Sequence, residues 1–228
     1  MLQGCRARVT PGHPARGRGN AVNQRSAGLK PHVAIVDSGG ANIASLAFAL
    51  ERLGIGSILT ADAAAIESAS HVILPGVGAA ADAMQKLRER NLTAVLRGLS
   101  QPVLGICLGL QLLAERSEEN GAECLGIIPG CARKLEGSPS SPVPNMGWCR
   151  VTTEKEHPLF DGIDSGTHFY FVHSYALGVA DFTVATATHT TPMTAVASHR
   201  NFCATQFHPE RSAAAGARLL ANFLAMHG

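Results

Sequence analysis

The chain has 228 residues, of which 46% are hydrophobic and only 5% aromatic, and this is typical of one α/β domain with an aliphatic core. Its net charge of +2 is uneven, because residues 1–30 carry six of the 19 basic residues and no acidic residue. With no basic stripe interleaved with aromatics and no long apolar run, the sequence excludes nucleic-acid-binding and membrane-spanning proteins, and we expect a soluble, cytoplasmic protein.

Residues 1–30 are expected to form a basic, disordered extension, and residues 31–228 a single folded domain. Pro11, Pro14 and nearby glycines oppose the amphipathic helix of a transit peptide. The six cysteines contain no C-x-x-C pair, and neither they nor the ten histidines cluster at metal-ligand spacing. We therefore expect free thiols, no metal ion and no cofactor.

The first half of the domain alternates short apolar strands with helices. A strand at 33–36 runs into a glycine turn, and the apolar residues between 43 and 53 then share one helical face before Gly54 ends the helix. Further strands are expected at 57–60, 72–74 and 103–106, the last running into a helix over 108–116. This alternation predicts an α/β fold with a central, mostly parallel or mixed sheet flanked by helices.

The second half changes character beyond about Gly126, where Pro- and Ser-rich loops separate short apolar runs. Strands are expected at 169–172, 182–187 and 193–197, followed by a last helix from about Ser212 to Met226. These closely spaced runs favour antiparallel or mixed strands within the same domain.

Gly105-Ile106-Cys107-Leu108-Gly109 has the pattern of a nucleophile elbow, in which a strand turns sharply into a helix between closely packed glycines. Cys107 would lie at the carboxyl edge of the sheet, where the helix N-terminus favours a thiolate and the Leu108 N–H can face a developing oxyanion. A buried structural cysteine is the alternative that this pentapeptide leaves open.

Gln206-Phe207-His208-Pro209-Glu210 supplies the acid/base that a thiolate nucleophile needs. Pro209 disfavours helix at His208, and Glu210 follows in a turn where it can accept the second imidazole N–H. A surface turn is the alternative, whereas a zinc deaminase is opposed because its P-C-x-x-C motif is absent.

Leu74-Pro75-Gly76-Val77-Gly78 ends a strand in a glycine-flanked loop that can present backbone N–H groups to a substrate. By itself, this segment could equally be an ordinary turn between a strand and a helix.

Together these motifs resemble those of the class I, Cys-His-Glu glutamine amidotransferases, and the resemblance covers nearly all of residues 32–228. It also rests on the segments 102–111, 143–148, 170–175 and 206–212. The LPGVG, MGW and YFVHSY motifs resemble one subfamily, the glutaminase subunits of imidazole glycerol phosphate synthase. The resemblance implies an amidotransferase domain over residues 31–228 that hydrolyses glutamine through a thioester. It also implies a heterodimer with a cyclase subunit that uses the ammonia in histidine biosynthesis.

The resemblance also implies a role for each matching residue. Cys107 is the nucleophile, His208 the acid/base and Glu210 the residue that orients it. The oxyanion and substrate-binding set is Gly76, Val77, Gly78, Leu108, Gln111, Ser174 and Tyr175, and the partner interface is Met146, Gly147 and Trp148. On a strand, His168 and His173 are expected to be structural.

The chain departs from the family pattern at Asn145, Cys149 and Ser38, where His, Asn and Tyr are usual. These departures concern partner contacts or coupling and leave the glutaminase residues whole. Three other interpretations stay open: an amidotransferase subunit for anthranilate or purine synthesis, a non-catalytic regulatory subunit of the same fold, and a cysteine peptidase of similar topology.

Overall fold

The computed structural model describes residues 33–39, 43–76 and 78–227 of the chain. The predicted extension over residues 1–30, and Val77 of the predicted oxyanion set, lie outside the described residues.

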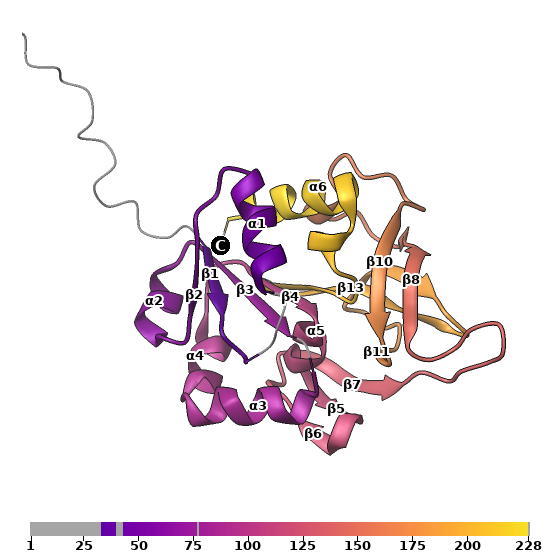
Figure 1. Cartoon of the computed structure of the whole chain (residues 1–228), viewed down its shortest axis with the longest axis horizontal. Coiled ribbons are helices and arrows are strands. Elements are labelled where there is room, and N and C mark those ends of the chain that lie inside the picture. The colour runs from indigo at the N-terminus through magenta and orange to yellow at the C-terminus, as the bar shows by residue number, and fades with distance from the viewer. Residues whose placement is uncertain (1–32, 40–42, 77, 228) are drawn as a thin grey trace, which may run out of the picture.

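An eight-stranded sheet forms the centre of the molecule, in the order β2-β1-β3-β4-β14-β13-β12-β9 (Figure 1). The strands are β2 (Ser57–Thr60), β1 (Val33–Val36), β3 (His71–Gly76), β4 (Val103–Cys107), β14 (Phe202–Thr205), β13 (Pro192–His199), β12 (Thr183–Thr188) and β9 (Thr152–Thr153). The first five run parallel and the last three pair antiparallel. The predicted mixed sheet is therefore confirmed. Four of its parallel strands are those expected in the first half, whereas the fifth, β14, comes from the second half and was not among the predicted strand ranges.

Helices cover both faces of this sheet, because its strands are apolar on both sides. One face packs against α1 (Ile43–Arg52) and α6 (Ala213–Leu224). The other face packs against α2 (Ala63–Ser68), α3 (Ala80–Glu89), α4 (Leu92–Gly98) and α5 (Leu108–Leu113). In β1 the side chains alternate between these two cores, with Val33 and Ile35 in the first and Ala34 and Val36 in the second.

Two smaller sheets extend the second half of the chain. One contains β5 (Ala114–Ser117), β6 (Ala122–Glu123), β7 (Ile128–Lys134) and β11 (Tyr175–Leu177), and the other pairs β8 (Asn145–Arg150) with β10 (His168–His173). Single turns of 3-10 helix occur at Glu119–Gly121, Pro158–Phe160 and Pro209–Arg211.

The helix predicted over residues 108–116 was too long, since α5 ends at Leu113. Ala114 is already extended, with φ of −67° and ψ of 175°, and it begins β5. Strand β5 pairs with β7 and β6, so hydrogen bonding to segments further along the chain replaces the local helix.

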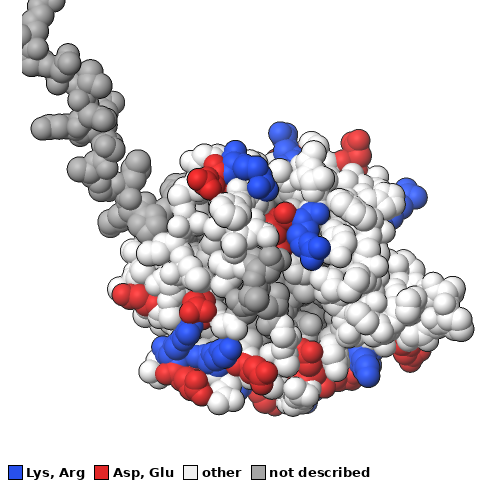
Figure 2. Space-filling model, viewed as in Figure 1, with Lys and Arg blue, Asp and Glu red and all other residues white. Residues whose placement is uncertain are grey.

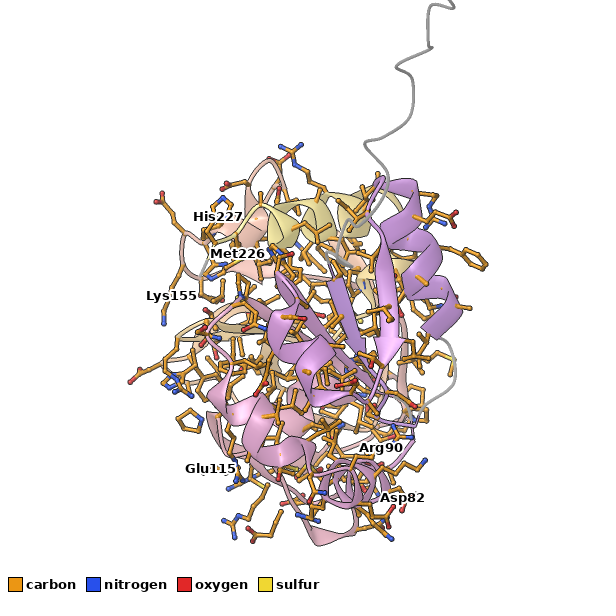
Figure 3. The ribbon with its side chains drawn as sticks, turned by 90° about the vertical axis from the view of Figure 1, so that its left-hand side faces the viewer. Asp82, Arg90, Glu115, Lys155, Met226 and His227 are labelled. Carbon is orange, nitrogen blue, oxygen red and sulfur yellow. The ribbon has the colours of Figure 1, made fainter. Side chains whose placement is uncertain are left out.

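Side chains from α3 and from Arg90, which directly follows it, hold the turn after β1 in place. Figure 3 labels Arg90, and Asp82 in the first turn of α3. Arg90 Nη1 lies 2.9 Å from Asp37 Oδ2 and also donates to the Asp37 carbonyl. Lys86 Nζ donates to the Gly39 carbonyl at 3.1 Å. These contacts hold the carboxyl end of β1 against the helix that follows β3.

Charged side chains of both signs gather over the α3 and α4 side of the molecule, whereas the lobe formed by the loop between β7 and β8 is white in the same view (Figure 2). Across the described ranges, the helices are all too short or too polar to cross a lipid bilayer.

Candidate active site

The carboxyl ends of three neighbouring parallel strands bring the predicted motifs together. Gly76 ends β3, Cys107 ends β4, and His208 follows shortly after β14. These strands are adjacent in the order β3-β4-β14, and Gly76 and Cys107 are direct partners in the register. Residues up to 132 positions apart in the sequence numbering therefore share one edge of the sheet.

Cys107 lies on a strained turn, as the elbow pattern predicts. Its φ of 54° and ψ of −103° place a residue with a side chain in a region that favours glycine. The strand and helix can fold back here because Gly109 touches β3: a Cβ at this position would lie 2.0 Å from the Leu74 carbonyl oxygen. The turn leaves Cys107 at the N-terminus of α5 with 8% of its surface exposed.

Replacing Gly109 with alanine is expected to destabilise the protein by about 3 kcal/mol, because backbone atoms would have to separate. Chemical denaturation measures this change in the free energy of unfolding. The matched control is Gly98→Ala at the end of α4, where an added Cβ meets nothing within 4 Å. Equal stability of the two variants would contradict the close packing at the elbow.

His208 and Glu210 are arranged as the sequence predicts. The imidazole Nδ1 lies 2.8 Å from Glu210 Oε1, and the two side chains are 7% and 5% exposed. Cys107 also interacts with the ring and helps to raise the pKa of the imidazole. The Cys107 Sγ also lies 3.6 Å from the Val172 carbonyl oxygen on β10.

The pKa of His208 is raised to about 10 even though burial lowers it, because hydrogen bonds and charges from Cys107 and Glu210 stabilise the imidazolium. The ring is therefore protonated at neutral pH beside the nucleophile. Such a pair can attack a carbonyl carbon through sulfur and then protonate a departing amine.

The backbone around His208 is held by residues to which the sequence analysis gave no role. Ser212 Oγ donates to the His208 carbonyl at 2.6 Å and accepts from the Tyr170 N–H at 3.0 Å. The His208 N–H donates to the Tyr170 carbonyl at 2.9 Å. Ser212 ends the segment 206–212 that carries the family resemblance, so its position beside His208 and Glu210 was the available signal.

A cavity of about 770 Å³ opens over Cys107 and His208. It is lined by Gly76, Gly78, Leu108, Gln111, Ser174 and Tyr175 from the predicted binding set. Gly78 has a φ of 93°, and Gly76 packs so closely on Leu108 that a Cβ there would lie 2.8 Å from the Leu108 Cβ. Apart from Val77, every residue of that set lies at the cavity.

Gln111 is buried one turn after Cys107 on α5, and its Oε1 accepts from Ser117 Oγ at 2.9 Å. Ser117 Oγ also accepts from the Glu119 N–H at 3.2 Å. The amide of Gln111 is thus held in one orientation by the segment that follows α5.

Glu119 is a lining residue that the sequence reasoning missed. Its Oε2 accepts from the Ala80 N–H at 2.8 Å, at the beginning of α3, where Ala79 offers no side-chain cap. The carboxylate places a negative charge at a cavity that also carries Arg211 and the histidines. No motif marks this position, because the turn that contains it reaches the cavity only through the strands β5 to β7.

The predicted interface residues lie on β8, beside the cavity. Met146 and Trp148 are 64% and 53% exposed, and Gly147 lies between them. The Trp148 ring meets the Tyr170 ring edge-on at 6.1 Å, and the Arg211 guanidinium lies 4.4 Å from the centre of the Tyr170 ring. Since Arg211 also lines the cavity, this exposed aromatic surface is continuous with it.

The two other histidines of this region differ. His168 is exposed at the start of β10, whereas His173 is buried at its end and lines the cavity. The five described cysteines are free thiols. Within residues 33–39, 43–76 and 78–227, no group of three or more His, Cys, Asp or Glu is placed to hold a metal ion.

Comparisons with known proteins find relatives that match most of the chain. A family model described as "Glutamine amidotransferase class-I" matches residues 34–226. The chain is 48% identical over 194 residues to the imidazole glycerol phosphate synthase subunit HisH of Xanthomonas oryzae pv. oryzae (strain MAFF 311018), covering 85% of this chain and 97% of that protein. It is 44% identical over 202 residues to the subunit of the same name from Vibrio cholerae serotype O1, covering 86% and 99%.

Solved structures show the same fold at low identity. A crystal structure of a glutamine amidotransferase matches with a TM-score of 0.66 at 19% identity, covering 85% of this chain and 97% of that chain. The glutaminase domain of Trypanosoma brucei CTPS matches with a TM-score of 0.55 at 17% identity, covering 84% and 92%.

Proposed function

The chain belongs to the class I glutamine amidotransferase family, and we propose that it is the glutaminase subunit of an imidazole glycerol phosphate synthase. It hydrolyses glutamine to glutamate and passes the ammonia to a cyclase subunit in histidine biosynthesis, as part of a cytoplasmic heterodimer. The observation that carries the proposal is the buried arrangement of Cys107, His208 and Glu210 at one edge of the sheet. The choice of this synthase is supported by the two relatives named imidazole glycerol phosphate synthase subunit HisH. The chain covers 97% and 99% of their lengths.

The reaction proceeds through a thioester. Cys107 Sγ attacks the carboxamide carbon of glutamine, and the negative charge that develops on oxygen is held by N–H groups of Leu108 and the glycine loop. The C–N bond then breaks as His208 gives its proton to the departing ammonia. A water molecule next loses a proton to His208 and attacks the thioester, which releases glutamate and restores the thiolate.

Charge complementarity explains how the cavity would select glutamine. The substrate carries an α-ammonium, an α-carboxylate and a neutral amide. Glu119 is suited to the ammonium, and the polar groups of Gln111, Ser174 and Tyr175 surround the remaining atoms. Glutamate carries a further negative charge in place of the amide, so the product is expected to bind less well.

The cyclase subunit would bind over β8. Met146 and Trp148 offer exposed apolar area, and interfaces are enriched in Trp and Met. Tyr170 contacts both Trp148 and the cavity residue Arg211, and a cyclase bound here would receive ammonia without its crossing bulk solvent. Ammonia reacts only while unprotonated, which makes a sheltered transfer advantageous.

The isolated protein is expected to hydrolyse glutamine slowly, and the cyclase subunit with its nucleotide ligand is expected to raise kcat at least about tenfold, a change of about 1.4 kcal/mol in the barrier. The measurement is steady-state glutamate production by the protein alone, with the cyclase, and with the cyclase and ligand. Equal rates in all three mixtures would contradict coupling to this partner.

Two matched variants locate the interface. Trp148→Ala should weaken binding of the cyclase subunit by about tenfold or more, as for a central aromatic contact. Leu59→Ala should leave binding unchanged, since Leu59 is similarly exposed, at 48%, but lies on the edge strand β2 at the opposite end of the molecule (Figure 1). Equal effects of the two would place the partner elsewhere.

A further inference from the structure

Strand β8 has two different faces. Met146 and Trp148 point outward and are exposed, whereas Asn145 is buried and Cys149 is half-buried on the inner face. In the antiparallel pairing of β8 with β10, Asn145 is the direct partner of His173. The inner face of β8 therefore reaches the strand that borders the catalytic cavity.

The hydrogen bonds of His173 determine where its proton lies. Its Nδ1 is 2.9 Å from the Tyr175 carbonyl oxygen, which can only accept, so Nδ1 carries the hydrogen. Its Nε2 is 3.1 Å from Asn145 Nδ2, which can only donate, so Nε2 accepts. The Cys149 thiol lies 3.5 Å from Asn145 Oδ1 and fits the same orientation of the amide.

The surroundings keep this imidazole neutral. Burial lowers the pKa of His173 to about 4, with smaller contributions from the nearby His189 and His208, and only the Tyr175 carbonyl opposes them. A neutral ring with its hydrogen on Nδ1 forms a hydrogen bond with both neighbours. In a protonated ring, Nε2–H would face the Asn145 Nδ2–H, and two donors cannot form a hydrogen bond.

The bond from His173 to the Tyr175 carbonyl encloses Ser174, and both Ser174 and Tyr175 line the cavity. On the other side of His173, the Val172 carbonyl faces the Cys107 thiol at 3.6 Å. Residues 172–175 thus form one wall of the site, which we call the β10 wall.

We propose that Asn145 is a positioning residue, whose side-chain amide holds His173 in one tautomer and so fixes the β10 wall against which glutamine binds. This inference rests on the proposed glutaminase function. Asn145 acts through His173 and does not itself line the cavity.

The first test compares Asn145→Ala with Cys149→Ala in the complex with the cyclase. Asn145→Ala should raise KM for glutamine about tenfold, the effect of losing one buried hydrogen bond, with kcat within about threefold of the wild type. Cys149→Ala keeps the bond between amide and imidazole and should leave KM unchanged. An Asn145→Ala protein that is folded and retains the wild-type KM would overturn the proposal.

The second test does not need activity. In Asn145→Asp a carboxylate, which can only accept, faces Nε2, so the pKa of His173 should rise from about 4 to above about 6. Imidazole resonances are titrated by NMR, and the His173 signal is assigned by its loss in His173→Gln. An unchanged pKa would overturn the proposal. A wild-type protein without glutaminase activity would instead refute the proposed function while this titration still reported on Asn145.

Discussion

Replacing Cys107 with alanine is expected to abolish glutamine hydrolysis, with kcat lowered on the order of 10⁴-fold or more, as when other covalent nucleophiles are removed. None of the other cysteines that the structure describes can substitute, because they lie off the cavity. Glutamate release under saturating glutamine measures the loss. Synthesis by the complex from added ammonium salt should be unaffected, because only the source of ammonia has been removed.

The control is Cys131→Ala on β7, which removes a half-buried free thiol outside the cavity and should leave both activities unchanged. If Cys107→Ala abolished the ammonia-dependent reaction as well, Cys107 would be needed for the structure of the complex. Full glutamine-dependent activity in that variant would refute the thioester mechanism.

The second large effect is expected at His208. His208→Ala removes the proton donor for the departing ammonia, and kcat should fall about 10²–10⁴-fold. Glu210→Gln should be milder, because an amide oxygen can still accept from Nδ1 and the acid/base itself remains. Steady-state kinetics of the two variants compares them directly, and equal, complete losses would contradict the separate roles.

The pH dependence distinguishes these roles further. The protonated imidazole is the acid, and the pKa of about 10 at His208 keeps it populated across neutral pH. Since Glu210 helps to raise that pKa in the free enzyme, Glu210→Gln should move the alkaline loss of kcat/KM to lower pH. An unchanged pH profile would show that Glu210 contributes little to the charge of His208.

The chemistry of the site could be predicted from the sequence because it is encoded locally. The glycines on either side of Cys107 and the two-residue spacing of His208 and Glu210 dictate their geometry with little help from the rest of the fold. The parallel strands β3 and β4 are also marked by apolar runs bounded by turns. Because parallel strands end at the same edge of a sheet, their motifs could be expected to lie close together.

The parts that could not be predicted depend on contacts between distant segments. Glu119 reaches the cavity because β5 and β7 pair, and the same pairing ends α5 at Leu113. Asn145 meets His173 only through the register of β8 with β10. Both pairings join segments that are distant in the sequence, and no local motif in either segment names its partner.

The strand order also governs when a growing chain acquires its chemistry. Strand β4, which carries Cys107, lies between β3 and β14 in the sheet. In the sequence, however, Cys107 precedes His208 by about a hundred residues and so leaves the ribosome well before it. Domains generally fold as units, with the N-terminal part synthesised first. A nascent chain that has formed β1 to β4 therefore holds a thiol with no imidazole beside it. The pair of Cys107 and His208 therefore exists only once β14 has taken its place in the sheet.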